Sequence, residues 1–279
     1  MTMTAAASSG QVPRRRKQQK STATLKTVDK ALNALDFLGV FGGQVGVREL
    51  AEYLGINKSS THRLLTTLES HGYVAQDPHT GKYQLGMRVF QVGAVVLGQT
   101  NLRAAARPHL ERLAETTGEV VHLVVENGGQ CLYVDKVVGA QAIPTGSALG
   151  WRRPLYCTGV GKVLLAHLPE HRRDQVVHGN GLRPYTPNTI TDPRVLVGEL
   201  EEIKTTGVAH DREEMEVGLR CVAAPVVGAD GRVVAAISVA GPTARFDADR
   251  LPHLTELVRA AAAAVSRDLA RAGAGRESR

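Results

Sequence analysis

A short amphipathic segment, a glycine turn and a second amphipathic segment constrain this fold most. The first segment repeats apolar residues at helical spacing from Val47 to Leu54, and Gly55 follows it. The second begins at Asn57 or Ser59, either of which can cap a helix because its side-chain oxygen accepts free backbone N–H groups. Two helices joined by a turn of about three or four residues that contains glycine form a helix-turn-helix. We therefore expect this motif here.

The flanking segments extend this motif to a winged helix. Upstream, the apolar residues between Val28 and Leu38 follow helical spacing, and a cluster of glycines from Gly39 to Gly43 ends the segment. Downstream, the short alternating segments YVAQ and KYQL flank the turn-rich DPHTG, which is typical of a β-hairpin. Three helices and a two-stranded hairpin predict a winged helix-turn-helix domain over residues 25–86.

A second unit follows a linker. Residues 87–101 are apolar enough for a linker helix with one buried face. Beyond them, hydrophobic periodicity predicts helices over 102–117, 158–167, 192–207 and 247–270, and strands over 119–127, 130–138 and within the hairpin 221–241. Strands interleaved with helices, and an antiparallel hairpin late in the chain, predict an α+β sensory domain with one curved sheet over 102–270, before a flexible tail at 271–279.

The net charge of +7 lies entirely in the two tails of the chain. Residues 1–24 carry five basic residues and no acidic residue, without apolar periodicity, and the rest of the excess falls in 271–279. We expect 1–24 to form a disordered basic arm. Such an arm is either a solubilising tail or an electrostatic contact with the phosphates of a nucleic acid.

Several other classes of protein fit the sequence poorly. It contains no run of about 18 apolar residues, so we expect no membrane span, and the basic N-terminus lacks the apolar stretch of a secretory signal. The three cysteines, Cys131, Cys157 and Cys221, are odd in number and widely spaced, which argues against a disulfide framework and against a C-x-x-C metal site. We expect a cytoplasmic protein without a membrane partner.

The second helix of the motif is predicted to expose polar side chains before its leucines. Leu64, Leu65 and Leu68 need one face, which Thr61 can share. Recognition helices reach base edges with their N-terminal turns, where Lys, Arg, Ser and Thr can bond bases or phosphates. The alternative is the solvated face of an ordinary packing helix. We predict DNA contacts from Lys58, Ser59, Ser60, Thr61, His62, Arg63 and Thr67, and from Lys82 in the hairpin loop.

Three stretches of the sequence resemble one known family. The DNA-binding domain of the IclR-type transcription regulators is similar to LAEYLGINKSSTHRLLTTLESHGYVAQDPHTGKYQLG. The two signature stretches of that family's effector domain are similar to RPLYCTGVGKVLLAHLP and GVAHDREEMEVGLRCVAAPVVGADGRVVAAISVAGP. The resemblance spans about 25–269. It implies a winged helix-turn-helix joined by a linker helix to a GAF-like effector-binding domain, in homodimers or homotetramers on double-stranded operator DNA.

The resemblance also implies a pocket for a small-molecule effector. In the family's pattern, the positions that line this pocket match Gly159, Val160, Asp211, Cys221 and Ser238. Some relatives have a second serine where this chain has Ala240, so its pocket is less polar. The helix start near 158–161 could hold a carboxylate on its free N–H groups, although tight packing there is the alternative. The GVGK run is not a phosphate loop, because Tyr156 and Val163 break that pattern.

Catalytic and metal-binding interpretations are the competing ones. A Cys221 nucleophile would need a base such as His122 or His210, with Asp211 or Glu213 to orient it, and nothing local marks an activated thiol. The two histidines, Asp211 and Cys221 could in principle hold a metal ion, but they lack ligand spacing. We therefore expect no catalytic residue, no metal site and no cofactor.

Together these patterns predict a ligand-responsive, DNA-binding transcription regulator. We expect a repressor of a metabolic or catabolic operon that senses a small organic acid or a related metabolite. The alternative is a metabolite-binding protein or a cysteine-dependent enzyme whose helix-turn-helix serves only contacts with other proteins.

Overall fold

The computed structural model describes residues 25–99, 102–143, 147–179 and 181–277. They form two compact units that meet in the sequence between Gln99 and Thr100, and each unit has a hydrophobic core of its own. Among the helices within these ranges, none is both long and apolar enough to cross a membrane.

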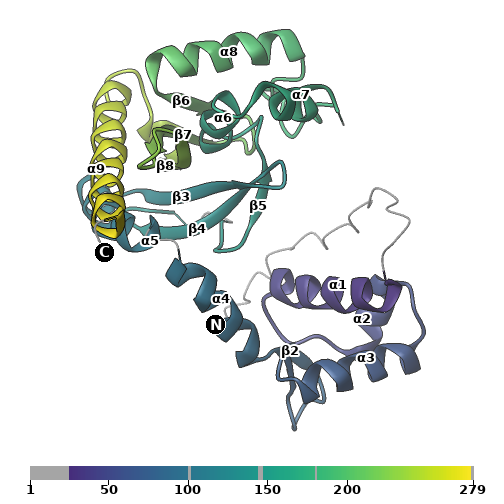
Figure 1. Cartoon of the computed structure of the whole chain (residues 1–279). Coiled ribbons are helices and arrows are strands. Elements are labelled where there is room, and N and C mark those ends of the chain that lie inside the picture. Colours follow the sequence, from purple (N-terminus) through teal and green to yellow (C-terminus); the bar gives the residue numbers. More distant parts are fainter. Residues whose placement is uncertain (1–24, 100–101, 144–146, 180, 278–279) are drawn as a thin grey trace, which may run out of the picture. The chain divides into compact units, whose positions relative to one another are not determined.

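The first unit is a winged helix (Figure 1). In chain order it contains α1 (Lys26–Phe41), α2 (Val47–Leu54), α3 (Lys58–Ser70), β1 (Val74–Gln76), β2 (Tyr83–Leu85) and α4 (Met87–Gln99). β1 and β2 pair antiparallel, with Val74 opposite Leu85. This order confirms the predicted helix-turn-helix and its wing.

A small core holds the three helices and the wing together. Its buried side chains are Ala34, Phe37 and Leu38 of α1, Leu50 and Leu54 of α2, Leu65 of α3, and Val45, Val74 and Tyr83 around the wing. Only the C-terminal half of α1 contributes, because Val28 and Leu32 remain 51% and 57% exposed. The helical spacing read from the sequence is therefore confirmed, while its first turns carry an apolar face that this unit does not bury.

Two residues define the turn between α2 and α3. Gly55 has a φ of 63°, a left-handed conformation that glycine adopts without strain, and its N–H closes α2 on the carbonyls of Ala51 and Glu52. Asn57 then accepts the N–H of Ser60 at 2.7 Å and so caps α3. Of the two capping residues that the sequence allows, the structure uses Asn57.

The second unit is built on one six-stranded antiparallel sheet. Its strands are β3 (Val120–Asn127), β4 (Gln130–Val138), β5 (Arg152–Pro154), β6 (Ala209–Arg212), β7 (Leu219–Val227) and β8 (Val233–Pro242). They lie in the order β5-β4-β3-β8-β7-β6. The hairpins β3–β4 and β7–β8, far apart in the sequence, therefore meet through β3 and β8, where His122 lies opposite Ser238.

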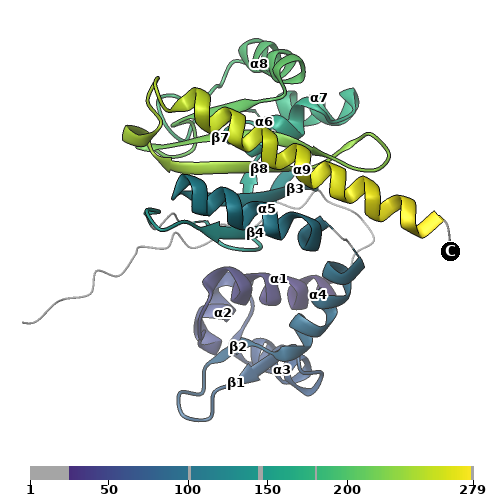
Figure 2. The ribbon, with the colours of Figure 1, turned by 90° about the vertical axis from the view of Figure 1, so that its left-hand side faces the viewer.

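Helices cover both faces of this sheet (Figure 2). α5 (Leu102–Thr117) and α9 (Leu251–Glu277) pack side by side on one face, around a core that includes Leu110 and Val258. α6 (Gly159–Ala166) and α8 (Pro193–Thr206) lie on the other face, with α7 (Glu170–His178) next to α8. This arrangement confirms the predicted α+β architecture.

Some elements differ from the sequence-based expectations. The sequence does not predict β5, which has only three residues, or α7, whose EHRRDQVVH buries Val177 alone. α9 continues to Glu277, so the boundary expected between 270 and 271 falls inside a helix. The basic arm expected at 1–24, the last two residues of the expected linker helix and residues 278–279 lie outside the described residues.

A buried carboxylate fastens the start of α9 to the sheet. Glu119 is 0% exposed and accepts two hydrogen bonds from Arg245, with Nε–Oε1 and Nη2–Oε2 distances of 2.6 and 2.7 Å. Arg245 belongs to the short 3₁₀ helix η1 (Thr243–Arg245). Arg250, just before α9, lies 3.4 Å from the same carboxylate and donates to the carbonyl of Thr117 at 2.8 Å.

A second buried carboxylate, Asp135, ties β4 to α5. It accepts hydrogen bonds from Arg103 Nε at 3.0 Å and from Arg107 Nη1 at 3.1 Å. The strand register shifts by one residue here, since Tyr133 pairs with Val124 while Asp135 pairs with Leu123. This β-bulge at Val134 sends Tyr133 to the α6 face of the sheet and Asp135 to the α5 face.

Candidate DNA-binding helix and ligand pocket

The N-terminal half of α3 exposes a continuous set of polar side chains. Its packed face is held by Leu65, which is 0% exposed, with Leu64 and Leu68 partly buried beside it. The exposed residues are Lys58, Ser59, Ser60, His62 and Arg63, followed by Thr67 one turn later. The first turn of α3 has no acidic residue. A helix start that presents hydroxyls, Lys and Arg has the groups that contact base edges and phosphates.

Thr61 differs from the other residues predicted to contact DNA. Its side chain is 0% exposed, and Oγ1 donates to the carbonyl of Asn57 at 3.1 Å. Thr61 lies one helical turn before Leu65 and therefore shares its packed face. A buried hydroxyl bonded within its own helix cannot reach a base, so the prediction for Thr61 is wrong.

The loop of the wing is shaped by Asp77. Its carboxylate accepts the N–H groups of Thr80 and His79 at 2.9 and 2.8 Å and the amide of Gln44 at 2.7 Å. These hydrogen bonds, led by the one from Thr80, lower the pKa of Asp77. Lys82 is exposed at the end of this loop. A contact between Lys82 and DNA stays a prediction.

The second unit contains a cavity of about 70 Å³ between α6, the sheet and the loop after β6. Val160, Asp211, Cys221 and Ser238 line it, as does Ala240. The structure thus gathers four of the five residues predicted to bind an effector, and the fifth, Gly159, begins α6 beside Val160. The remaining lining residues are His122, Tyr133, Ser147, Trp151, Arg153, Thr158, Met215, Glu216 and Leu219.

His122 is the polar centre of this cavity's sheet wall. Its Nε2 lies 2.8 Å from Ser147 Oγ, and its Nδ1 lies 3.5 Å from Ser238 Oγ. The ring meets that of Tyr133 edge to face, with centroids 5.2 Å apart. Burial, together with the positive charge of Lys136, lowers the pKa of His122 to about 3. The imidazole is therefore neutral near pH 7 and offers hydrogen bonds without a charge.

Asp211 supplies an ionisable group to the same cavity. Burial raises the pKa of this carboxyl to about 7, although its Oδ1 accepts the N–H of Glu214 at 2.8 Å, which opposes the rise. Near neutral pH the side chain is thus divided between a neutral acid that can donate a hydrogen bond and a carboxylate that repels anions.

Gly159 is required by a close approach between α6 and β7. A Cβ at this position would lie 2.7 Å from Cys221 Sγ, closer than real contacts allow. The backbone N–H of Gly159 bonds this thiol. Thr158 caps α6 by accepting the N–H of Gly161 at 3.1 Å. Two N–H groups at the helix start therefore already have protein partners, which reduces the number left for a carboxylate ligand.

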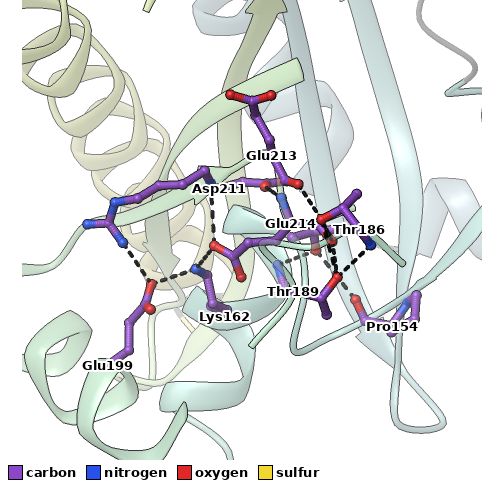
Figure 3. A network of polar contacts seen from close by, with 11 residues as sticks. Pro154, Lys162, Thr186, Thr189, Glu199, Asp211, Glu213 and Glu214 are labelled. Carbon is purple, nitrogen blue, oxygen red and sulfur yellow. Dashed lines mark hydrogen bonds and ion pairs between the residues drawn. The ribbon is translucent and has the colours of Figure 1, made fainter. Parts of the chain in front are cut away.

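A network of charges lies behind the cavity wall (Figure 3). Lys162, 0% exposed, donates to Glu199 Oε1 at 2.5 Å and forms an ion pair with Glu214. The hydroxyls of Thr186 and Thr189 donate to the carbonyls of Glu213 and Glu214, at 2.7 and 2.6 Å. These bonds hold the loop after β6, which contributes Met215 and Glu216 to the cavity, and in which Glu213 has a left-handed φ of 65°.

Of the residues considered for a nucleophile or a metal site, Asp211 and Cys221 lie near each other, but the two histidines lie on different sides of them. His122 lines the cavity described above, whereas His210 lies on the opposite side of β6 and does not line it. Burial raises the pKa of the Cys221 thiol, so it stays protonated. Within the described ranges, no group of three or more His, Cys, Asp or Glu residues has metal-binding geometry. All three cysteines are buried free thiols.

Sequence reasoning missed several residues that the cavity uses. Tyr133, Trp151, Arg153 and Met215 line it but belong to no motif that marks a pocket. The sequence does hint at a role for Lys162, because a lysine inside the apolar run GVGKVLLA needs an acidic partner when it is buried. The sequence does not show that Glu199 and Glu214 are those partners, since both lie far from Lys162 along the chain.

Comparisons with protein families match both units. The family model described as "Bacterial transcriptional regulator IclR C-terminal" matches residues 94–267, and that of the IclR helix-turn-helix domain matches residues 27–78. XynR, an HTH-type transcriptional regulator of Escherichia coli, is 35% identical over 88% of this chain and 97% of its own length. The acetate operon repressor of Salmonella typhimurium is 33% identical over 88% and 90%.

Solved structures agree with this likeness. The IclR protein of Thermotoga maritima is 37% identical, with a TM-score of 0.72 over 88% of this chain and 98% of its own. An IclR homologue of Microbacterium hydrocarbonoxydans, solved in complex with 4-hydroxybenzoate, is 24% identical, with a TM-score of 0.78 over 87% and 98%. The second likeness concerns the fold alone.

Proposed function

Because the chain belongs to the IclR family of bacterial transcription regulators, we propose that it represses a metabolic or catabolic operon and senses a small organic acid. As a member of that family it is a DNA-binding regulator. The observation that carries the proposal is the exposed N-terminal half of α3, where Lys58 and Arg63 flank a run of polar side chains. Curated relatives support the direction of control, since one is an acetate operon repressor.

The chemistry of the cavity supports an organic acid with an apolar or aromatic body. Arg153 supplies a cation, 4.2 Å from the centroid of the Trp151 ring, on which a carboxylate could form an ion pair. Tyr133 and Trp151 offer aromatic surface, while neutral His122 and Ser238 offer hydrogen bonds. The complex of the Microbacterium relative with 4-hydroxybenzoate makes that acid the first compound to test.

We propose that two or four copies assemble on the operator. The apolar start of α1, where Leu25 precedes the helix and Val28 and Leu32 lie in its first turns, is between 51% and 76% exposed at these residues and provides a surface for a second copy. A dimer would present two α3 helices to a pseudo-palindromic site. The cytoplasm is the compartment that this function requires.

Replacing Arg63 by alanine should weaken binding to the operator by about 1–3 kcal/mol, because a guanidinium can bond guanine or phosphate from the start of α3. A gel-shift titration with the DNA upstream of the protein's own gene measures the change. Wild-type binding should also weaken as the salt concentration rises, since phosphate contacts release counterions.

The matched control removes a positive charge elsewhere. Arg194→Ala on α8, whose side chain is 92% exposed, should leave operator affinity unchanged. Equal affinity of wild type and Arg63→Ala would show that α3 does not read the operator. If the wild-type protein did not shift this DNA specifically, the helix-turn-helix would be assigned to contacts with other proteins.

Binding of an acid in the cavity should depend on pH through Asp211. Above pH 7 this carboxyl ionises and repels a carboxylate ligand, so affinity should fall by up to about tenfold per pH unit. Asp211→Asn should remove that dependence while its carbonyl still accepts the N–H of Glu214. Calorimetric titration of 4-hydroxybenzoate between pH 6 and 8 tests both; parallel pH profiles of wild type and variant would exclude Asp211 from the site.

Ligand binding without turnover is our proposal for this cavity. The protonated Cys221 thiol packs against Gly159, which suits a wall residue. The curated relatives reported above are regulators. A thermal-shift screen of small organic acids would identify the ligand class, and Ser238→Ala should abolish the shift produced by any acid that binds here.

A further inference from the structure

A second cavity, of about 130 Å³, lies at the β6 edge of the sheet. Its walls come from His210 and Arg212 of β6, Arg220 of β7, Phe246 after η1, and Leu251 at the start of α9. One buried water needs only about 10–15 Å³ of such space. The cavity is therefore large enough for a small polyatomic ion.

Basic side chains outnumber acidic ones in this cavity, since Asp211 is the one acid among the described residues that line it. In the register of the sheet, Arg212 lies directly opposite Arg220, with His210 two residues before Arg212 on the same face of β6. Arg220 Nε forms an ion pair with Glu213 Oε1 at 3.7 Å, and Arg212 Nη1 forms one with Glu199 Oε1 at 3.7 Å. Both distances exceed a hydrogen bond. Neither arginine is therefore hydrogen-bonded to the acid with which it forms an ion pair.

Two buried nitrogen atoms in this group lack a hydrogen-bond partner. Within the described part of the chain, His210 Nδ1 and Arg220 Nε are both buried and unpartnered. Arg220 uses Nη1 for the carbonyl of Phe246, at 3.4 Å. Buried polar atoms are nearly always satisfied, so an orphaned guanidinium N–H beside a cavity points to an acceptor that occupies it. A neutral His210 can present Nδ1 as a donor by its choice of tautomer.

We propose that this cavity binds a small oxyanion, a phosphate or a carboxylate, between Arg212, Arg220 and His210. An oxyanion supplies the acceptors that the two unpartnered nitrogens lack, and its negative charge is attracted to both guanidinium groups. Phe246 and Leu251 provide the apolar part of the lining.

The site is distinct from the effector cavity but shares a wall with it. The strands β6 and β7 lie between the two cavities, and Asp211 of β6 and Cys221 of β7 line both of them. An ion held on one side of these strands therefore fixes the backbone that carries Asp211 on the other. The oxyanion would act as a second signal whose coupling to the effector is reciprocal. Oxyanion binding itself does not depend on the proposed repressor function.

Isothermal titration calorimetry of the full chain with sodium phosphate, with sodium acetate and with sodium chloride at matched ionic strength tests the proposal. We expect saturable binding of phosphate or of acetate, but not of chloride. The anion with the higher affinity shows whether the site prefers phosphates or carboxylates. Arg220→Gln should weaken that binding by about tenfold or more, as should His210→Leu. Arg232→Gln, a control on the β7–β8 turn whose side chain is 86% exposed, should leave it unchanged.

Two variants separate this cavity from other anion sites. Ser238→Ala alters the effector cavity alone and Arg63→Ala alters α3 alone, so neither should change the affinity for the anion. The proposal is overturned if neither anion saturates, or if Ser238→Ala or Arg63→Ala abolishes binding. It is also overturned if Arg212→Gln, Arg220→Gln and His210→Leu, in whichever of them folds, all retain wild-type affinity.

Discussion

Replacing Lys162 by methionine should lower the free energy of unfolding by about 3–5 kcal/mol, since removal of one partner leaves a buried charge uncompensated. Lys162 holds both Glu199 and Glu214, whose side chains are only 16% and 3% exposed. Arg212, at 3.7 Å, would remain as the cation of Glu199, but Glu214 would lose its ion pair. Urea denaturation of the two proteins at pH 8 measures the difference.

The loss should shrink at low pH. Burial already raises the pKa of Glu214 against the opposing effect of Lys162, and without the lysine that pKa rises further. A folded state that binds more protons than the unfolded state loses stability as the pH rises from the unfolded pKa to the folded pKa. The variant should therefore approach wild-type stability near pH 5 and fall behind it by pH 8.

A second substitution should rescue the variant. Glu214→Gln removes the uncompensated charge, so Lys162→Met combined with Glu214→Gln should recover most of the lost stability. Lys204→Met, which breaks an exposed pair with Glu201, should cost less than about 1 kcal/mol. A pH-independent loss, or no recovery in the double variant, would mean that the packing of the lysine stem and not its charge matters.

Arg245→Ala should also cost about 3–5 kcal/mol, because Glu119 is 0% exposed and would lose both of its short hydrogen bonds. Arg250, at 3.4 Å, compensates only partly. Arg250→Ala should therefore cost less, on the order of 1–2 kcal/mol, mainly through its bond to the Thr117 carbonyl. Thermal unfolding followed by circular dichroism, with urea titration for the free energies, compares the variants.

Two controls separate charge burial from a general effect of losing an arginine. Arg232→Ala, exposed on a turn, should be neutral. Glu119→Gln should regain part of the stability in the Arg245→Ala background, since an amide is cheaper to bury than an unpaired carboxylate. If Arg245→Ala and Arg232→Ala were equally stable, the buried pair would have no net effect on stability.

Much of the fold follows from the sequence because local signals agree with tertiary packing. Gly55 and Asn57 mark the turn and the cap of α3, and the structure uses both as expected. α7 was not predicted because its single buried valine gives no hydrophobic periodicity. β5 was not predicted because three residues are too few to show alternation. The end of α9 was missed because RAGAGRE is rich in glycine, which normally ends helices rather than continuing them.

The site was predictable only in part. Asp211, Cys221 and Ser238 line one cavity, as the family pattern implies. Tyr133 and Arg153 also line it, but they lie on β4 and β5, and the position of these strands depends on pairing that the local sequence does not reveal. Thr61 shows the opposite error. Its residue type is suited to DNA contact, but its side chain lies on the packed face of its helix. The orphaned nitrogens of His210 and Arg220 have no counterpart in any sequence motif.

The bulge at Val134 makes β4 a strand with two independent tasks. On one side of the bulge Tyr133 faces the ligand cavity, and on the other Asp135 holds Arg103 and Arg107 of α5. Substitutions at Tyr133 should therefore alter the ligand preference proposed for this cavity while the attachment of α5 is preserved. Because the two roles are separate, ligand specificity could change by single substitutions at Tyr133. Protein engineers could use this position to alter the proposed ligand preference without disturbing the packing of α5 on the sheet.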